Sequence, residues 1–172
     1  MDIQFREATE KDQPVLSNLG RYYSYDISEY AHAHSDWYHC DDNGEFQSGC
    51  DQYFGDASYS SFLFRVEAEL SGFAIIQKLQ GDPHADYTVS EFFITRAFRR
   101  RGVGKYVAHT LFDKFPGRWD VMVWPVNTSA LLFWDKVITE YAGDSSTATF
   151  ERPARYHGWR MCVYRFTSRI ER

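Results

Sequence analysis

The chain has 172 residues, of which 44% are hydrophobic and 18% aromatic, and this fits one domain with a sizeable core. The aromatic content argues against a disordered chain, and the 5 Pro and 11 Gly argue against a fibrous one. The net charge of −5 at pH 7 disfavours a general nucleic-acid binder.

The sequence has no long apolar segment and no paired cysteine motif. Its apolar stretches are short, such as Phe73–Ile76, whereas a transmembrane helix needs about 20 apolar residues. The N-terminus lacks the apolar run of a signal peptide. Three cysteines, an odd number without a CxxC pair, fit a reducing compartment. We therefore expect a cytoplasmic protein with no membrane partner.

Seven strands and four helices are predicted. The expected strands are, in chain order, 3–7, 61–67, 72–79, 87–95, 119–124, 147–151 and 159–167. The expected helices begin after the capping pair Thr9 and Asp12, within 22–60, near Gly102, and at Asn127 or Thr128. This order indicates an α/β chain with a mixed sheet and helices around it.

Residues 22–60 form an acidic and aromatic segment. They contain eight acidic residues, ten aromatic residues and no Lys or Arg, so the rest of the chain carries a net charge of +3. An acidic, aromatic cleft attracts cations. The alternative is a solvated acidic loop with aromatic residues packed underneath it.

The segment 96–105, RAFRRRGVGK, can form an anion site between a strand and a helix. It has five cations, two glycines and no acid. Glycines let the backbone approach a phosphate, and the first N–H groups of a helix lack intrahelical partners. A Walker A loop does not fit, because Tyr106 replaces the required Ser or Thr, and a GxGxxG loop fails at Val107. The alternative is a solvated basic turn at the start of an ordinary helix.

Two motifs give these residues a family context. Arg99-x-x-Gly102-x-Gly104 follows one strand, and Asn127-x-x-Ala130-x-x-Phe133 follows the next. This pattern resembles the GNAT superfamily of N-acetyltransferases, in particular bacterial acetyltransferases with RRKGVG and FPGxWEV…NxxAxxFW motifs. The resemblance implies a single domain over 1–172 with a mainly antiparallel twisted sheet of about six to seven strands and about four helices. It places 22–60 on the acceptor side.

The resemblance also implies the cofactor, acetyl-CoA, and the residues that bind it. Backbone amides of the 96–105 turn would hold the diphosphate, and the strand before it would bind the pantetheine arm. The cofactor-binding residues are Phe93, Ile94, Arg96, Arg99, Arg100, Arg101, Gly102, Val103, Gly104, Lys105, Asn127, Ala130, Phe133 and Trp134. The backbone N–H of Ile94 would polarise the thioester carbonyl.

Two residues bear on proton transfer. Glu91 is the candidate general base, acting directly or through water; alternatively, it holds a tyrosine or an arginine, or its side chain points away. Trp134 stands where most of the family has a tyrosine, the proposed acid for the CoA thiolate. An indole cannot act as a titrating acid, so tryptophan at this position puts the identity of the acid in question, but not the acetyl transfer itself.

The predicted function is acetyl transfer to a primary amine, in a small molecule or a peptide, which the acidic segment suggests is cationic. The rival hypothesis is a non-catalytic acyl-CoA-binding module; nucleic-acid binding is disfavoured. No metal is expected, because His32, His34, His39 and Cys40 match no zinc spacing. The oligomeric state is open, with a homodimer as one option.

Overall fold

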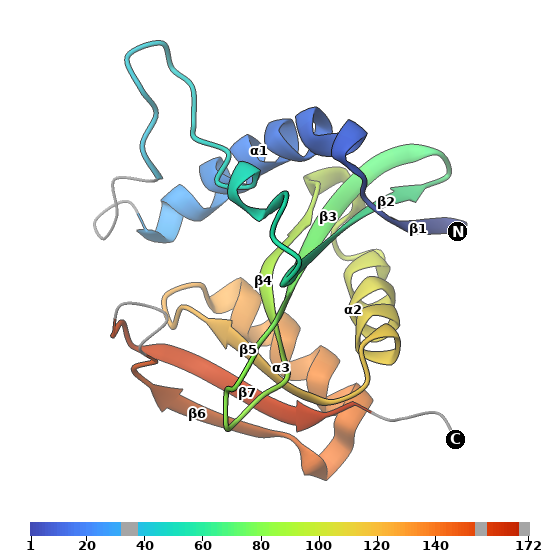
Figure 1. Ribbon diagram of the computed structural model, residues 1–172, viewed down its shortest axis with the longest axis vertical. Coiled ribbons are helices and arrows are strands. Elements are labelled where there is room, and N and C mark those ends of the chain that lie inside the picture. Colours follow the sequence, from blue (N-terminus) through green and yellow to red (C-terminus); the bar gives the residue numbers. More distant parts are fainter. Residues whose placement is uncertain (32–37, 154–157, 169–172) are drawn as a thin grey trace. The chain divides into compact units, whose positions relative to one another are not determined.

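The computed structural model describes residues 1–31, 38–153 and 158–168 (Figure 1). Its strands are β1 (Ile3–Glu7), β2 (Tyr59–Val66), β3 (Glu69–Lys78), β4 (Tyr87–Ile94), β5 (Arg118–Val123), β6 (Thr147–Glu151) and β7 (Met161–Thr167). Its α-helices are α1 (Gln13–Ala31), α2 (Val103–Lys114) and α3 (Thr128–Ala142). The expected α/β class and the order of the strands are confirmed, and most strand boundaries lie close to those predicted.

The strands form a sheet in the order β1-β2-β3-β4-β5-β7-β6. The pairs β1–β2, β5–β7 and β6–β7 are antiparallel, whereas β4 and β5 run parallel. The register between β4 and β5 consists of two pairs, Tyr87 with Trp119 and Thr88 with Asp120. The expected mainly antiparallel, mixed sheet is therefore confirmed.

The helix predicted within 22–60 as a separate element is wrong for the described part of that segment. The helix α1 continues without a break as far as Ala31, so it takes up residues assigned to a second helix. Beyond residue 37, the described chain forms a short 3-10 turn at Asp51–Tyr53, and Gly44, Gly49 and Gly55 adopt positive φ angles that interrupt a helix. Three α-helices, rather than four, are found in the described residues.

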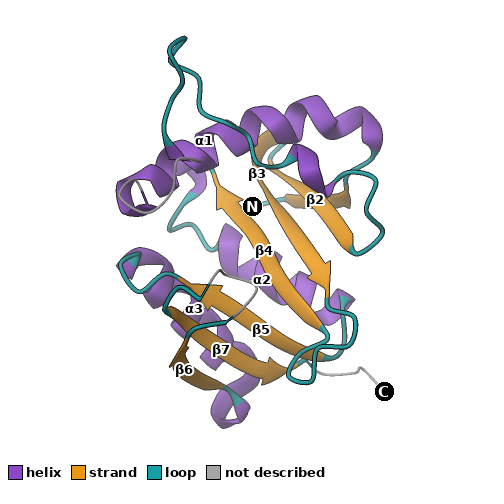
Figure 2. Ribbon diagram, turned by 60° about the vertical axis from the view of Figure 1, so that its left-hand side comes forward, coloured by secondary structure: helices purple, strands orange, loops and turns teal. Residues whose placement is uncertain are grey.

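The chain divides into two compact units. Unit 1 comprises Met1–Ile75 and Glu91–Arg99, and unit 2 comprises Ile76–Ser90 and Arg100–Arg172. In unit 1, α1 packs its apolar face against the sheet (Figure 2). The core of this unit is formed by Leu16, Leu19, Cys50, Leu63, Phe73, Ile75 and Phe93.

The core of unit 2 is built around Trp119. Its side chain is fully buried and stacks on Phe166, and Phe112 of α2 meets its ring edge-on at 5.0 Å between centroids. The indole Nε1–H donates a hydrogen bond to the Phe115 carbonyl at 3.0 Å, which satisfies its polar group. On the same unit, α3 packs against β5 and β7.

Candidate functional site

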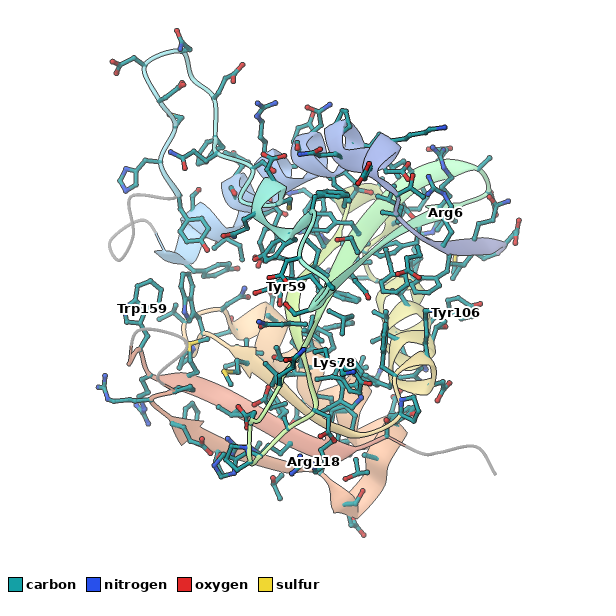
Figure 3. The ribbon with its side chains drawn as sticks, in the orientation of Figure 1. Arg6, Tyr59, Lys78, Tyr106, Arg118 and Trp159 are labelled. Carbon is teal, nitrogen blue, oxygen red and sulfur yellow. The ribbon has the colours of Figure 1, made fainter. Side chains whose placement is uncertain are left out.

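Glu91 lies on β4 among tyrosines. It shares a strand face with Phe93, which packs in the core of unit 1. The Tyr53 hydroxyl donates a hydrogen bond to Glu91 Oε1 at 2.6 Å, and Tyr23 of α1 also interacts with this carboxylate and helps to lower its pKa. Tyr59, which is labelled in Figure 3, lies against Tyr53 with ring centroids 4.8 Å apart. The carboxylate is thus placed where α1 and the turn that ends at Tyr53 meet the strand.

This environment raises the pKa values of Glu91, Tyr38 and Cys50. Burial raises the pKa of Glu91 above its ordinary value, and the hydrogen bonds from Tyr53 and Tyr23 offset part of that effect. Burial first, and then the charge of Glu91, raises the pKa of Tyr38 to about 12 and that of Cys50 to about 12. Glu91 is therefore a carboxylate among neutral groups, and a raised pKa suits it to accept a proton near neutral pH.

At the end of β4, two arginines bind one carboxylate of α1. Arg96 Nη2 lies 2.7 Å from Asp26 Oδ1, and Arg99 Nη2 donates to Asp26 Oδ2. Arg99 also donates from Nε to the Ile94 carbonyl at 2.8 Å, and its guanidinium lies 5.6 Å from the centroid of the Phe93 ring. These contacts fix the position of Arg99, the first residue of the R-x-x-G-x-G motif, within unit 1.

The rest of that motif opens α2 in unit 2. Gly102 is the N-cap residue and adopts a left-handed conformation with φ of 82°, and a Cβ placed there would meet no described heavy atom within 4 Å. Among the described residues no side chain caps this helix start. The first backbone hydrogen bond of the helix runs from Tyr106 N–H to the Gly102 carbonyl at 3.0 Å, so the N–H groups of Val103, Gly104 and Lys105 precede it. The first turn of α2 thus presents backbone N–H donors that have no intrahelical acceptor.

The cations of the turn differ in their surroundings. Arg100 has a φ of 60° and, like Arg101, is exposed. Lys105 Nζ lies 3.2 Å from Glu140 Oε2 on α3. Tyr106, which takes the place of the Ser or Thr of a Walker A loop, points outward from α2 (Figure 3).

The start of α3 confirms the predicted cap. Asn127 Oδ1 accepts a hydrogen bond from Ala130 N–H at 3.0 Å. Ala130 and Phe133 are partly buried. Trp134 is 6% exposed and packs against Phe133 and, across to α2, against Phe112. Trp134 thus belongs to the core of unit 2.

The sequence reasoning did not assign the residues that surround Glu91. Tyr53 and Tyr38 were noted only as members of an aromatic segment, and Tyr53 lies 38 positions before its carboxylate partner. Cys50 and Gly20, which approach each other closely within unit 1, were not assigned. An isolated glycine within a helical pattern often marks close packing, and this signal could have pointed to Gly20.

The described residues contain no group of three or more His, Cys, Asp and Glu side chains arranged to hold a metal ion. His39 and Cys40 are among the described residues, whereas His32 and His34 lie outside them. Within the described chain, no helix is both long enough and apolar enough to cross a membrane.

Comparison with known proteins identifies the fold. An acetyltransferase from Thermus thermophilus is 16% identical with a TM-score of 0.67, and the match covers 97% of each chain. The ribosomal-protein-S18-alanine N-acetyltransferase of Escherichia coli is 14% identical with a TM-score of 0.60, over 99% of this chain and 97% of that one. A proposed streptothricin acetyltransferase from Bacillus anthracis, solved in complex with acetyl coenzyme A, is 10% identical with a TM-score of 0.60, over 97% of this chain and 99% of that one.

Comparison with curated protein sequences returned no match. The model of the acetyltransferase (GNAT) family matches residues 22–137, which is more than half of the chain. This range includes Glu91, the turn that opens α2 and the start of α3. The chain belongs to the acetyltransferase (GNAT) family.

Proposed function

We propose that the chain transfers an acetyl group from acetyl-CoA to a primary amine, which reacts directly in a ternary complex. The start of α2 carries the proposal, because Gly102 opens this helix with no side-chain cap among the described residues. Backbone N–H groups and the positive end of the helix dipole suit a diphosphate there. The complex of the Bacillus anthracis neighbour with acetyl coenzyme A supports the choice of donor.

The proposed cofactor residues begin with the backbone of Arg101–Lys105 and the charge of Arg100. Phe93 and Ile94, at the end of β4, are proposed to bind the pantetheine arm. Because Arg96 and Arg99 form ion pairs with Asp26, their proposed role is to hold the 96–105 turn in place. From α3 and its cap, the proposed cofactor residues are Asn127, Ala130, Phe133 and Trp134. Trp134 is buried in the core, so its proposed role is to support the helix face rather than to hydrogen-bond the cofactor.

Bound acetyl-CoA would supply an activated thioester, at which the N–C bond forms while the C–S bond breaks and CoA leaves as a thiolate. The chain itself must take up the proton that the amine loses. Glu91 is suited to this task because burial raises its pKa. Its hydrogen bond with Tyr53 is compatible with this role, since one carboxylate offers several lone pairs. The backbone N–H of Ile94 is the proposed oxyanion donor.

The leaving group needs no acid from α3. Trp134 lies in the core of unit 2, and an indole N–H does not titrate. A thiol has a pKa of about 8.5, so its thiolate is a tolerable leaving group at neutral pH. Water can protonate it after it departs.

The proposed acceptor is a cationic amine, such as a polyamine-like molecule, an aminoglycoside-like molecule or a peptide amine. Glu91 accepts a hydrogen bond from the Tyr53 hydroxyl and also interacts with Tyr23, so the groups around it are aromatic and uncharged. A carboxylate beside aromatic rings suits an ammonium group through charge and ring faces. The residues 22–60 that carry these rings also hold eight acids and no Lys or Arg.

Thiol release from acetyl-CoA over a panel of amines tests the proposal, with Gly104→Glu as the diagnostic variant. A carboxylate beside the start of α2 should weaken CoA binding by about 100-fold or more, through repulsion of the diphosphate. Thr139→Glu adds the same charge at an exposed position of α3 and should bind CoA as the parent chain does.

Two results would count against the proposal. Normal CoA binding by Gly104→Glu would refute the assignment of the 96–105 turn as the binding site of the diphosphate. Tight CoA binding by the parent chain without thiol release for any amine would instead support a non-catalytic acyl-CoA-binding module.

The proposal places the enzyme in the cytoplasm, where the free thiols of Cys40, Cys50 and Cys162 stay reduced. Its partners are the donor and the amine, with no role for nucleic acid or a membrane. Sedimentation velocity would decide between a monomer and a homodimer.

A further inference from the structure

Gly20 occupies the middle of α1, at the point where a turn formed by residues 48–53 approaches the helix. A Cβ built on Gly20 would lie 2.6 Å from the Ser48 carbonyl oxygen, 2.6 Å from Ser48 Oγ and 2.7 Å from Cys50 Sγ. All three separations are far shorter than van der Waals contact, and one of the atoms is backbone. Any other residue at position 20 must therefore displace this turn from α1.

The same turn is held by its own hydrogen bonds and by α1. Cys50 N–H donates to Ser48 Oγ at 3.1 Å, and Tyr53 N–H donates to the Cys50 carbonyl at 3.2 Å. The hydroxyl of Ser17, one turn before Gly20 on α1, donates to the Asp51 carboxylate. Cys50 is 1% exposed and belongs to the core of unit 1. The turn is thus fixed to α1 on both sides of Cys50.

The turn ends at the residue that binds Glu91. The Tyr53 hydroxyl lies 2.6 Å from Glu91 Oε1, which is the short separation of a charge-assisted bond. Such a bond sets the rotation of the carboxylate and favours its ionised form, in opposition to burial. A shift of the turn would lengthen this bond without changing either of the two residues.

We propose that Tyr53 and Gly20 are positioning residues for Glu91: Tyr53 holds the carboxylate through its hydroxyl, and Gly20 lets the turn approach α1 closely enough to place that hydroxyl. The inference rests on the proposed function, in which Glu91 accepts the proton of the amine. It deepens that function because the orientation of the base then depends on a contact between α1 and a distant turn.

The first test compares Tyr53→Phe with the parent chain. The protonation of Glu91 is followed by 13C NMR of its side-chain carboxyl, and kcat/KM is measured against pH. Loss of the hydroxyl should move the Glu91 titration, and with it the acidic limb of the kcat/KM profile, to higher pH. On the acidic side kcat/KM should fall by about tenfold, as expected for a lost hydrogen bond to a charged group.

Tyr141→Phe is a matched control. The Tyr141 hydroxyl donates to Asp113 Oδ1 at 2.6 Å, so the control removes a phenol–carboxylate bond of the same length within unit 2. It should leave the Glu91 titration and the pH profile unchanged. An unshifted Glu91 titration in Tyr53→Phe would overturn the proposal for Tyr53.

The second test is Gly20→Ala. Alanine is normally more favourable than glycine inside a helix, so a purely helical effect would raise the unfolding temperature. The close contact predicts the reverse, a lower unfolding temperature, together with a Glu91 titration shifted in the same direction as in Tyr53→Phe. Ser28→Ala, another substitution by alanine on α1, should show neither change.

The outcomes separate this inference from the proposed function. A Gly20→Ala variant that behaves as Ser28→Ala does would refute the role of Gly20, and Tyr53→Phe would still decide the role of Tyr53 if Gly20→Ala failed to fold. If no amine is acetylated, the proposed function fails, whereas the NMR titration still decides whether the turn controls Glu91.

Discussion

A carboxylate that loses water on folding costs stability whenever it is ionised, and Glu91 is such a group. Burial raises its pKa above that of the unfolded chain. The folded state is therefore most favoured when Glu91 is protonated, below the unfolded pKa of about 4.3. That advantage is lost as the pH rises through the folded pKa.

Glu91→Gln should therefore raise the free energy of unfolding at pH 7 while it lowers kcat by about 100-fold or more, as expected for loss of a general base. The gain in stability should shrink at about pH 4, where Glu91 in the parent chain is itself protonated. Urea unfolding at both pH values, with thiol release as the activity readout, checks this. A variant that is less stable at pH 7 would contradict it.

Residues in local motifs could be predicted from the sequence, and residues joined by the fold could not. Gly102 was predicted from its place between a strand and a helix, and the structure gives it the left-handed conformation that glycine tolerates. The bond between Tyr53 and Glu91 spans 38 positions and depends on how the turn packs on α1. No periodicity in either segment encodes that contact.

At the scale of elements, helix ends with strong local signals were predicted well. Asn127 caps α3, and Phe115, just before Pro116-Gly117, is the C-cap of α2. The separate helix expected within 22–60 is wrong, because α1 continues through Gly20 to Ala31, and this glycine serves a packing contact. The edge strand β6 was predicted with its observed bounds, Thr147–Glu151.

An ion pair ties β6 to its neighbour β7. Arg165 donates from Nη1 to Glu151 Oε1 and from Nη2 to Glu151 Oε2, the latter at 2.8 Å, and Thr149 Oγ1 donates to Glu151 at 2.6 Å. The bonds from Arg165 first, and then from Thr149, lower the pKa of Glu151 to about 2. The stabilisation is therefore present above the unfolded pKa and is lost as the pH falls toward 2.

Glu151→Gln should lower the free energy of unfolding at pH 7 by about 0.5–1 kcal/mol, a value reduced by the screening of a partly exposed pair. The difference from the parent chain should fade between about pH 4 and pH 2. Denaturant titrations across this range check the effect. Asp144→Asn, on the exposed turn after α3, serves as the control, and an equal loss there would remove the special role of Glu151.

At the scale of the whole molecule, charge is unevenly distributed along the chain. Residues 22–60 hold eight acids and no Lys or Arg, whereas the remainder has a net charge of +3. The sequence shows this asymmetry directly, because charge does not depend on packing. A field of this kind raises the local concentration of cations, and salt screens it.

Raising the ionic strength from about 20 mM to about 300 mM at saturating acetyl-CoA should increase the apparent KM of a cationic acceptor several-fold, because the Debye length shortens over this range. Initial rates of thiol release give this value. An acceptor amine with a carboxylate of its own should show a weaker dependence. A KM that does not respond to salt would argue against electrostatic capture.

The two-pair register between β4 and β5 affects how the protein must be handled. Within unit 2, Val89 and Ser90 of β4 follow the last pair of that register, and a strand segment without a partner on one side resembles the open border of a sheet, which invites a foreign strand. Under the proposed function, a pantetheine arm bound along this part of β4 would also protect it from self-association. Protein from which CoA has been removed should then aggregate sooner on storage, seen as a rise in turbidity, than protein kept saturated with CoA.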